Sequence, residues 1–205
     1  QMSVAQSTTL SEQETIINIM VRVFHWSIIV LFVLLFVTGD NNDGSDALHI
    51  VSGHLLVSFL LARMLWGMIG NENARWKNYL YYPKQIISYL AQLFDTTLVH
   101  KFQLHNPAGS SMILLMMGVL SITAITGLLL ESLFEFSGVL LFATAYFNND
   151  SALLIREVHG ILAYLMLFAI GFHVAGVLYS SFLYKENMSL MMMTGKVSFL
   201  KKEEV

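Results

Sequence analysis

An uncharged stretch over residues 158–184 limits what this chain can fold into more than any other part of the sequence. At a rise of about 1.5 Å per residue, a helix over these 27 residues is roughly 40 Å long and exceeds the hydrocarbon core of a bilayer. The stretch contains two ionisable side chains, His159 and His173. Because an ionisable group inside a membrane is costly, it marks a functional site by default. We therefore predict a membrane-spanning helix with functional histidines.

Composition and three further apolar stretches indicate an integral membrane protein. Of 205 residues, 56% are hydrophobic and only 12% are charged, about half the charged share of a soluble domain. The sequence predicts an all-α, integral membrane four-helix up-and-down bundle over residues 18–184. The expected spans are about residues 18–38, 48–69, 108–130 and 153–184. A polar N-terminal tail (1–17), without the basic start of a signal peptide, and a basic tail (185–205) flank the bundle.

Two of the connections between spans have a pattern of their own. In residues 70–107, Pro83 precedes KQIISYLAQLF, an amphipathic segment that predicts a helix lying at the membrane interface. Residues 131–150 are acidic and aromatic. The piece FSGVLLF within them is too short to cross a bilayer, so we expect it to be re-entrant or interfacial.

The distribution of basic residues predicts the orientation. Ten of the 11 lysines and arginines fall in the tails, in residues 70–107 or at the span ends next to them, and Arg156 alone falls on the other side. Because cytoplasmic loops are enriched in Lys and Arg, both termini and the long middle connection are expected in the cytoplasm.

Four histidines then fall at two depths. His25 lies 13 residues, or about 20 Å, from the outer end of its span, and His49 lies near the outer start of the next. His159 and His173 are 14 residues apart, so they share a helix face at depths roughly 21 Å apart. The depths predict two pairs: His49 with His159 on the outer side, and His25 with His173 on the inner side.

Facing neutral imidazoles in a bundle core are the ligands expected of a b-type haem. Gly53 lies on the same face as His49 and leaves room for a flat ring, and Arg63, at the inner depth, could bind a propionate. A single histidine in a span more often bonds a neighbouring helix, but four at matched depths favour ligation. The chain has no cysteine, which excludes disulfides, thiolate metal sites and covalently attached haem.

His54 competes with His49 for the outer position. It lies five residues further on, about 140° around the helix and roughly 7.5 Å deeper. This geometry favours His49. His100 and His105 fall in the middle connection and are expected to be interfacial residues.

Several short stretches together resemble the bacterial di-haem transmembrane cytochrome b family, the type that includes the membrane subunits of nickel–iron hydrogenases. They are RVFHW (22–26), HIVSG (49–53) with RMLWG (63–67), HNPAG (105–109), TGLLL (126–130), and the spaced histidines of the fourth span with MTGK (193–196). The resemblance covers residues 20–197. It implies that His25, His49, His159 and His173 ligate two haem b groups. His54 departs from the family pattern and leaves open a ligand swap or a polar contact to the outer haem.

The expected function is electron transfer across the bacterial cytoplasmic (inner) membrane, between the quinone pool and a redox partner protein on the outer side. We expect quinone at the cytoplasmic end, with Asn106 and His105 as polar candidates, although Asn106 and Pro107 could simply start the third span. One alternative is a self-contained quinone-linked oxidoreductase, such as a superoxide oxidase or ferric reductase, and the acidic outer loops disfavour an anionic substrate.

A second alternative is a small proton or metal transporter without haem. Apart from Glu157 near the outer end of the fourth, the predicted spans contain no Asp or Glu, which counts against it. The sequence has no glycine-rich phosphate loop, and we expect no nucleic-acid partner.

Overall fold

The structure, a computed structural model, describes residues 17–39, 47–93 and 106–196. Four long helices dominate this part of the chain: α1 (Ile19–Thr38), α2 (Ala47–Ile69), α4 (Pro107–Phe134) and α5 (Asn149–Tyr184). Each is long and apolar enough to cross a membrane, and the described ranges contain no strand. The predicted all-α four-helix fold is confirmed.

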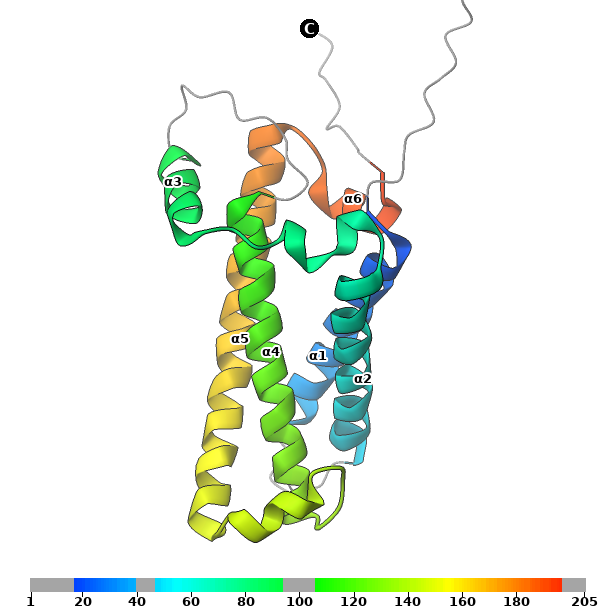
Figure 1. Cartoon of the computed structure of the whole chain (residues 1–205), viewed down its shortest axis with the longest axis vertical. Helices are drawn as coiled ribbons and strands as arrows, with labels where there is room; N and C mark the ends of the chain where they lie inside the picture. Colours follow the sequence, from blue (N-terminus) through cyan, green and yellow to red (C-terminus); the bar gives the residue numbers. More distant parts are fainter. Residues whose placement is uncertain (1–16, 40–46, 94–105, 197–205) are drawn as a thin grey trace, which may run out of the picture.

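The four helices run up and down as two antiparallel pairs (Figure 1). α1 packs against α2, α4 packs against α5, and α2 also contacts α4. Two short helices, α3 (Pro83–Leu93) and α6 (Met188–Thr194), lie at the end of the bundle where the described chain starts and stops, at the top of Figure 1. We call this the terminal end. The opposite end carries the 3₁₀ helix η3 (Leu141–Tyr146), and we call it the η3 end.

Local sequence signals set the helix boundaries. The Asn106 side chain accepts a hydrogen bond from the Gly109 N–H at 2.7 Å, and Pro107 occupies the first helical position of α4. Asn148 and Ser151 form a capping box at the start of α5. This cap starts α5 at Asn149, before the predicted position 153.

α4 continues to Phe134, four residues beyond the predicted end of the third span. The prediction ended the span at Leu130, before the first charged residue, Glu131, but glutamate, serine and leucine are all compatible with a helix. The chain departs from the helix only after Glu135, where Phe136 takes a left-handed conformation with φ of 51°. Glu131 therefore lies in the last turn of α4.

A buried apolar cluster occupies the middle of the bundle. It consists of Leu31, Phe32, Leu56, Leu60, Val119, Leu120 and Met166. Met166 lies seven residues from His159 and seven from His173, so the cluster separates the depths of these two histidines. Large apolar side chains are also exposed on all four long helices. Helices that are apolar on both their packed and their exposed faces fit a bundle surrounded by lipid.

The segment after α2 folds back onto the terminal end of that helix. It contains two short 3₁₀ helices, η1 (Glu72–Ala74) and η2 (Trp76–Asn78). The Trp76 indole donates to the Met64 carbonyl at 3.1 Å. The buried guanidinium of Arg63 lies 4.4 Å from the Trp76 ring centroid and donates to the Ala74 carbonyl at 3.3 Å. The helix expected near residues 84–94 is α3, and its Tyr89 hydroxyl lies 3.0 Å from that of Tyr184 on α5.

Candidate functional site

The structure brings the four histidines singled out by the sequence together as two pairs. The rings of His49 on α2 and His159 on α5 have centroids 6.4 Å apart and an interplanar angle of 69°. The rings of His25 on α1 and His173 on α5 also have centroids 6.4 Å apart, with an angle of 58°. The first pair lies toward the η3 end and the second toward the terminal end. α5 therefore contributes one ring to each pair.

The spacing of both pairs fits a metal held between two imidazoles. With metal–nitrogen bonds of about 2 Å and about 1 Å from each nitrogen to its ring centre, the two ring centres lie roughly 6 Å apart. Among the described residues, no group of three or more His, Asp or Glu side chains could hold a bare metal ion. A two-histidine site instead fits a metal whose remaining ligands come from a macrocycle, as in haem.

Threonines orient both rings of the His49–His159 pair. The Thr38 hydroxyl lies 3.2 Å from His49 Nδ1, and the Thr126 hydroxyl lies 2.9 Å from His159 Nδ1. Each hydroxyl donates its own hydrogen to a carbonyl in the preceding turn of its helix, at 2.8 Å. Each therefore accepts from the imidazole, so both Nδ1 atoms carry hydrogen and both Nε2 atoms carry the lone pair that a metal requires.

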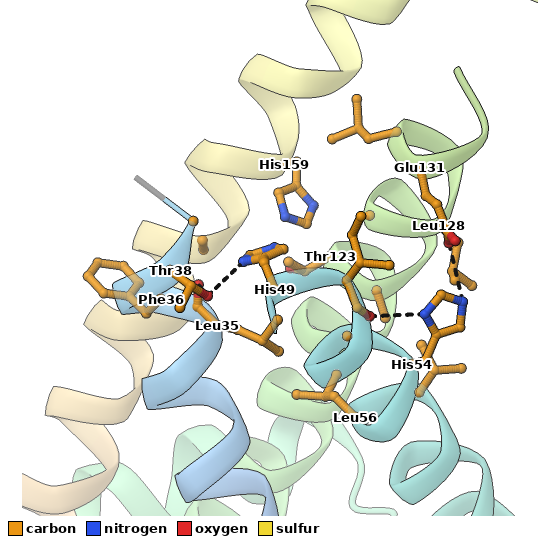
Figure 2. A pocket seen from close by; sticks show the side chains of 18 of the residues that line it. Leu35, Phe36, Thr38, His49, His54, Leu56, Thr123, Leu128, Glu131 and His159 are labelled. Carbon is orange, nitrogen blue, oxygen red and sulfur yellow. Dashed lines mark hydrogen bonds and ion pairs between the residues drawn. The ribbon is translucent and has the colours of Figure 1, made fainter. Parts of the chain in front are cut away.

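A cavity of about 640 Å³ surrounds this pair, within the size range of cofactor sites. All four long helices contribute to its wall, and Gly53, Gly127 and Gly160 are among its lining residues. A Cβ on Gly127 would lie 3.2 Å from the His159 ring, so the absence of a side chain there lets α4 approach the imidazole closely. Figure 2 shows His49 and His159 reaching into this space.

The structure also separates the roles of the two histidines of α2. His49 faces His159, whereas Nε2 of His54 lies 3.2 Å from the Glu131 carboxylate of α4 (Figure 2). Glu135 and Arg156 are the other charged residues of the cavity wall. The sequence predicted His49 as the partner of His159 but did not predict the contact between His54 and Glu131, because it treated residue 131 as part of a connection.

The His25–His173 pair has different surroundings. The Trp26 ring packs edge-on against His25 with centroids 5.5 Å apart. His25 Nδ1 is buried and has no hydrogen-bond partner among the described residues. An unpaired buried nitrogen costs about 1–3 kcal/mol. Among the described residues, no hydrogen bond orients the His25 ring as Thr38 orients the His49 ring.

The C-terminal segment holds the start of α1 beside this pair. Arg22 donates to the Thr194 carbonyl at 2.9 Å, and the Trp26 indole donates to the Met192 carbonyl at 3.4 Å. Met191 of α6 is buried. The sequence described residues 185–205 only as a basic tail, whereas residues 188–194 form a helix whose end contacts the RVFHW stretch.

The remaining predicted residues lie at the terminal end. Arg63 is enclosed by Ala74 and the Trp76 ring, and Asn106 uses its side-chain oxygen to cap α4. His100, His105 and the acidic residues of the first connection lie outside the described residues. Tyr79 is buried beside Arg63, and burial raises the pKa of its phenol.

Comparison with known proteins identifies a family. The family model described as prokaryotic cytochrome b561 matches residues 16–195, which include all four paired histidines. Neither the curated proteins nor the solved structures include a match to the chain.

Proposed function

Because the chain belongs to the prokaryotic cytochrome b561 family, whose members bind haem b, we propose that each histidine pair holds one haem b. We further propose that the protein passes electrons across the bacterial inner membrane, between the quinone pool and a redox partner on the outer side. The observation that carries the proposal is the equal 6.4 Å spacing of two imidazole pairs at two depths of one bundle.

The residues of this chain would hold and orient the haems, and the haems would supply one-electron redox chemistry. His25 with His173, and His49 with His159, would hold the two haems through their ring nitrogens. Thr38 would keep the His49 tautomer that presents Nε2. The two sites would be roughly 21 Å apart along α5, with the buried apolar cluster between their depths, so an electron could cross without a mobile carrier.

Charge supports an orientation with the terminal end in the cytoplasm. The basic residues described at this end are Arg22, Arg63, Arg75, Lys77, Lys84, Lys185 and Lys196. Arg156 alone among the described basic residues lies at the η3 end. The positive-inside rule then makes His25–His173 the cytoplasmic pair and His49–His159 the outer pair.

The quinone site is proposed at the cytoplasmic end, beside the inner haem. Asn106 lies there and could bind a quinone oxygen with its amide N–H groups, while its oxygen caps α4. Arg63 is buried in the part of α2 that lies toward the terminal end. It would bind a propionate of the inner haem. An Asn106→Ala variant that kept both haems and full quinone-linked turnover would remove Asn106 from the site.

The haem proposal is tested by a pyridine haemochrome assay on the purified protein. We expect two haems per chain, and one in each of the variants His159→Leu and His173→Leu. A colourless protein, or either variant retaining both haems, would refute the proposal.

Charge at the η3 end favours one second candidate, a quinone-linked reductase of a cationic metal substrate such as ferric iron. In the described part of this end, the exposed charged residues are the three acids Glu135, Asp150 and Glu157 and the single arginine Arg156. Such a surface repels an anion such as superoxide and attracts cations. Reduction of a ferric chelate by the purified, quinol-supplied protein alone would favour this candidate, and no reduction without an added partner protein would favour the electron conduit.

A further inference from the structure

A histidine–carboxylate pair is built into the wall of the cavity at the η3 end, apart from the two imidazole pairs. Nε2 of His54 lies 3.2 Å from Oε2 of Glu131, and the two side chains are 42% and 11% exposed. They come from different helices, α2 and α4, and both line the cavity that holds His49 and His159 (Figure 2).

The hydrogen-bond partners fix how many protons this pair holds. Nδ1 of His54 lies 2.9 Å from the Ile50 carbonyl, which can only accept, so Nδ1 donates. A bond between Nε2 and the carboxylate then requires one further hydrogen, on either the imidazole or the carboxyl group. The pair therefore carries one shared proton and no net charge in this arrangement.

The Glu131 carboxylate also lies close to the backbone that follows α4. Gly138, which follows the end of α4, has φ of +91°, and a Cβ there would lie 2.8 Å from the carboxyl carbon of Glu131. Only glycine adopts this conformation easily and permits this approach. The backbone after α4 thus covers Glu131 and leaves His54 as its more exposed partner.

Few other titratable side chains line the cavity that contains the pair. On the cavity wall, α4 also contributes Glu135, α5 contributes Arg156 and His159, and α2 contributes His49. The wall residues from α1 are Phe32, Leu35, Phe36, Thr38 and the adjoining Gly39, none of which is titratable. With one arginine and two glutamates, the wall depends on the proton of the His54–Glu131 pair to stay close to neutral.

We propose that the His54–Glu131 pair is a proton-binding site coupled to reduction of the haem at the His49–His159 pair. This inference rests on the proposed function. When that haem gains one electron from the inner haem or from a partner protein, the added negative charge raises the proton affinity of groups in the same low-dielectric cavity. While that haem is oxidised, the pair would lack the shared proton. On reduction it would take this one proton from the outer water, forming one N–H bond on His54 Nε2 or one O–H bond on Glu131, and it would release the proton when the electron leaves.

The test is a spectroelectrochemical redox titration of the haem-loaded full-length protein at a series of pH values between about 5.5 and 8.5. We expect the midpoint potential of one haem to fall with rising pH, with a limit of about 59 mV per pH unit for one proton per electron. The variant His173→Leu, which keeps only the other haem, should retain this slope and so identifies the haem concerned.

The variants His54→Gln and Glu131→Gln should each flatten the slope while keeping two haems per chain. Glu135→Gln changes another acid of the same wall and should leave the slope unchanged. A flat slope in the wild type, or an unchanged slope in both pair variants, overturns the inference while leaving the haem assignment intact. Protein without haem would instead refute the proposed function. If His54→Gln does not fold, Glu131→Gln alone decides.

Discussion

The two histidine pairs have the same ring spacing and share one helix, but different parts of the chain hold their rings. Thr38 and Thr126 fix the His49–His159 pair from within the bundle. At the His25–His173 pair, Nδ1 of His25 has no partner among the described residues, and α1 is instead held from outside by carbonyls of the C-terminal segment. Equal spacing therefore does not require equal support, and the two sites should fail in different ways.

The largest expected effect separates the two histidines of α2. His49→Leu removes a ring that faces His159, so we expect the variant to bind one haem per chain instead of two. His54→Leu removes a ring that faces Glu131 and should keep both. Haemochrome assays on the two variants measure this difference. One haem in His54→Leu and two in His49→Leu would contradict this assignment and identify His54 as the haem-binding histidine of α2.

The next effect concerns the threonines that orient the outer pair. Thr126→Val removes the hydroxyl that accepts from the His159 N–H and leaves only the Thr123 backbone carbonyl as a described acceptor for that ring. Loss of such a hydroxyl partner typically costs 10–100-fold in metal affinity. We expect a haem affinity lower by about this factor at the His49–His159 pair only, measured by haem titration of the apoprotein. Thr123→Val is the matched control, because the Thr123 hydroxyl donates to the Val119 carbonyl of its own helix. Equal losses in both variants would contradict the orienting role.

A smaller effect should appear only at the His25–His173 pair. Arg22→Gln removes a charged donor from the Thr194 carbonyl, a bond worth about 1.5–3 kcal/mol. We expect faster loss of haem absorbance from this pair on heating, and no change at the other. Lys196→Gln, which removes a charge from the same segment, is the control. A change at both pairs would show that the C-terminal segment supports the whole bundle.

The smallest effect is a pH dependence of stability confined to the terminal end. Burial raises the pKa of Glu186, so the folded protein binds more protons than the unfolded chain, and stability falls as pH rises from the ordinary glutamate range toward that raised value. Hydrogen bonding to Lys77 lowers the pKa of Glu72, which gives the opposite sign: stability is lost as pH falls. The fall of the thermal unfolding midpoint, as pH rises from the ordinary glutamate range toward the raised pKa of Glu186, should disappear in Glu186→Gln. It should remain in Glu72→Gln.

The sequence was sufficient to predict the four helices and both histidine pairs because these depend on long-range periodicity. Apolar length identifies a span, and the 14-residue spacing on α5 places His159 and His173 on one face regardless of packing details. His49 could be preferred over His54 for the same reason, since five residues turn a helix by about 140°.

The supporting contacts could not be predicted, because they join residues on different helices. Helical periodicity relates residues within one helix and does not say which side chains of two helices meet. Thr126 meets His159 across 33 residues, and Arg22 meets Thr194 across 172. Glu131 was placed in a connection because a charge at the end of an apolar run usually marks the membrane surface. One signal was present in TGLLLE, which begins with Thr126 and ends with Glu131. From the last turns of α4, Thr126 contacts His159 of α5 and Glu131 contacts His54 of α2.

Because α5 contributes one ring to each pair, the segment between His159 and His173 cannot gain or lose residues freely. Deleting one residue between His159 and His173 would rotate one ring about 100° away from its partner, whatever residue was lost. Adding seven residues would restore the facing to within about 20° but lengthen the helix by about 10 Å. Substitutions in this interval are therefore tolerable where insertions and deletions are not, and the interval should have the same length in every chain that keeps both pairs.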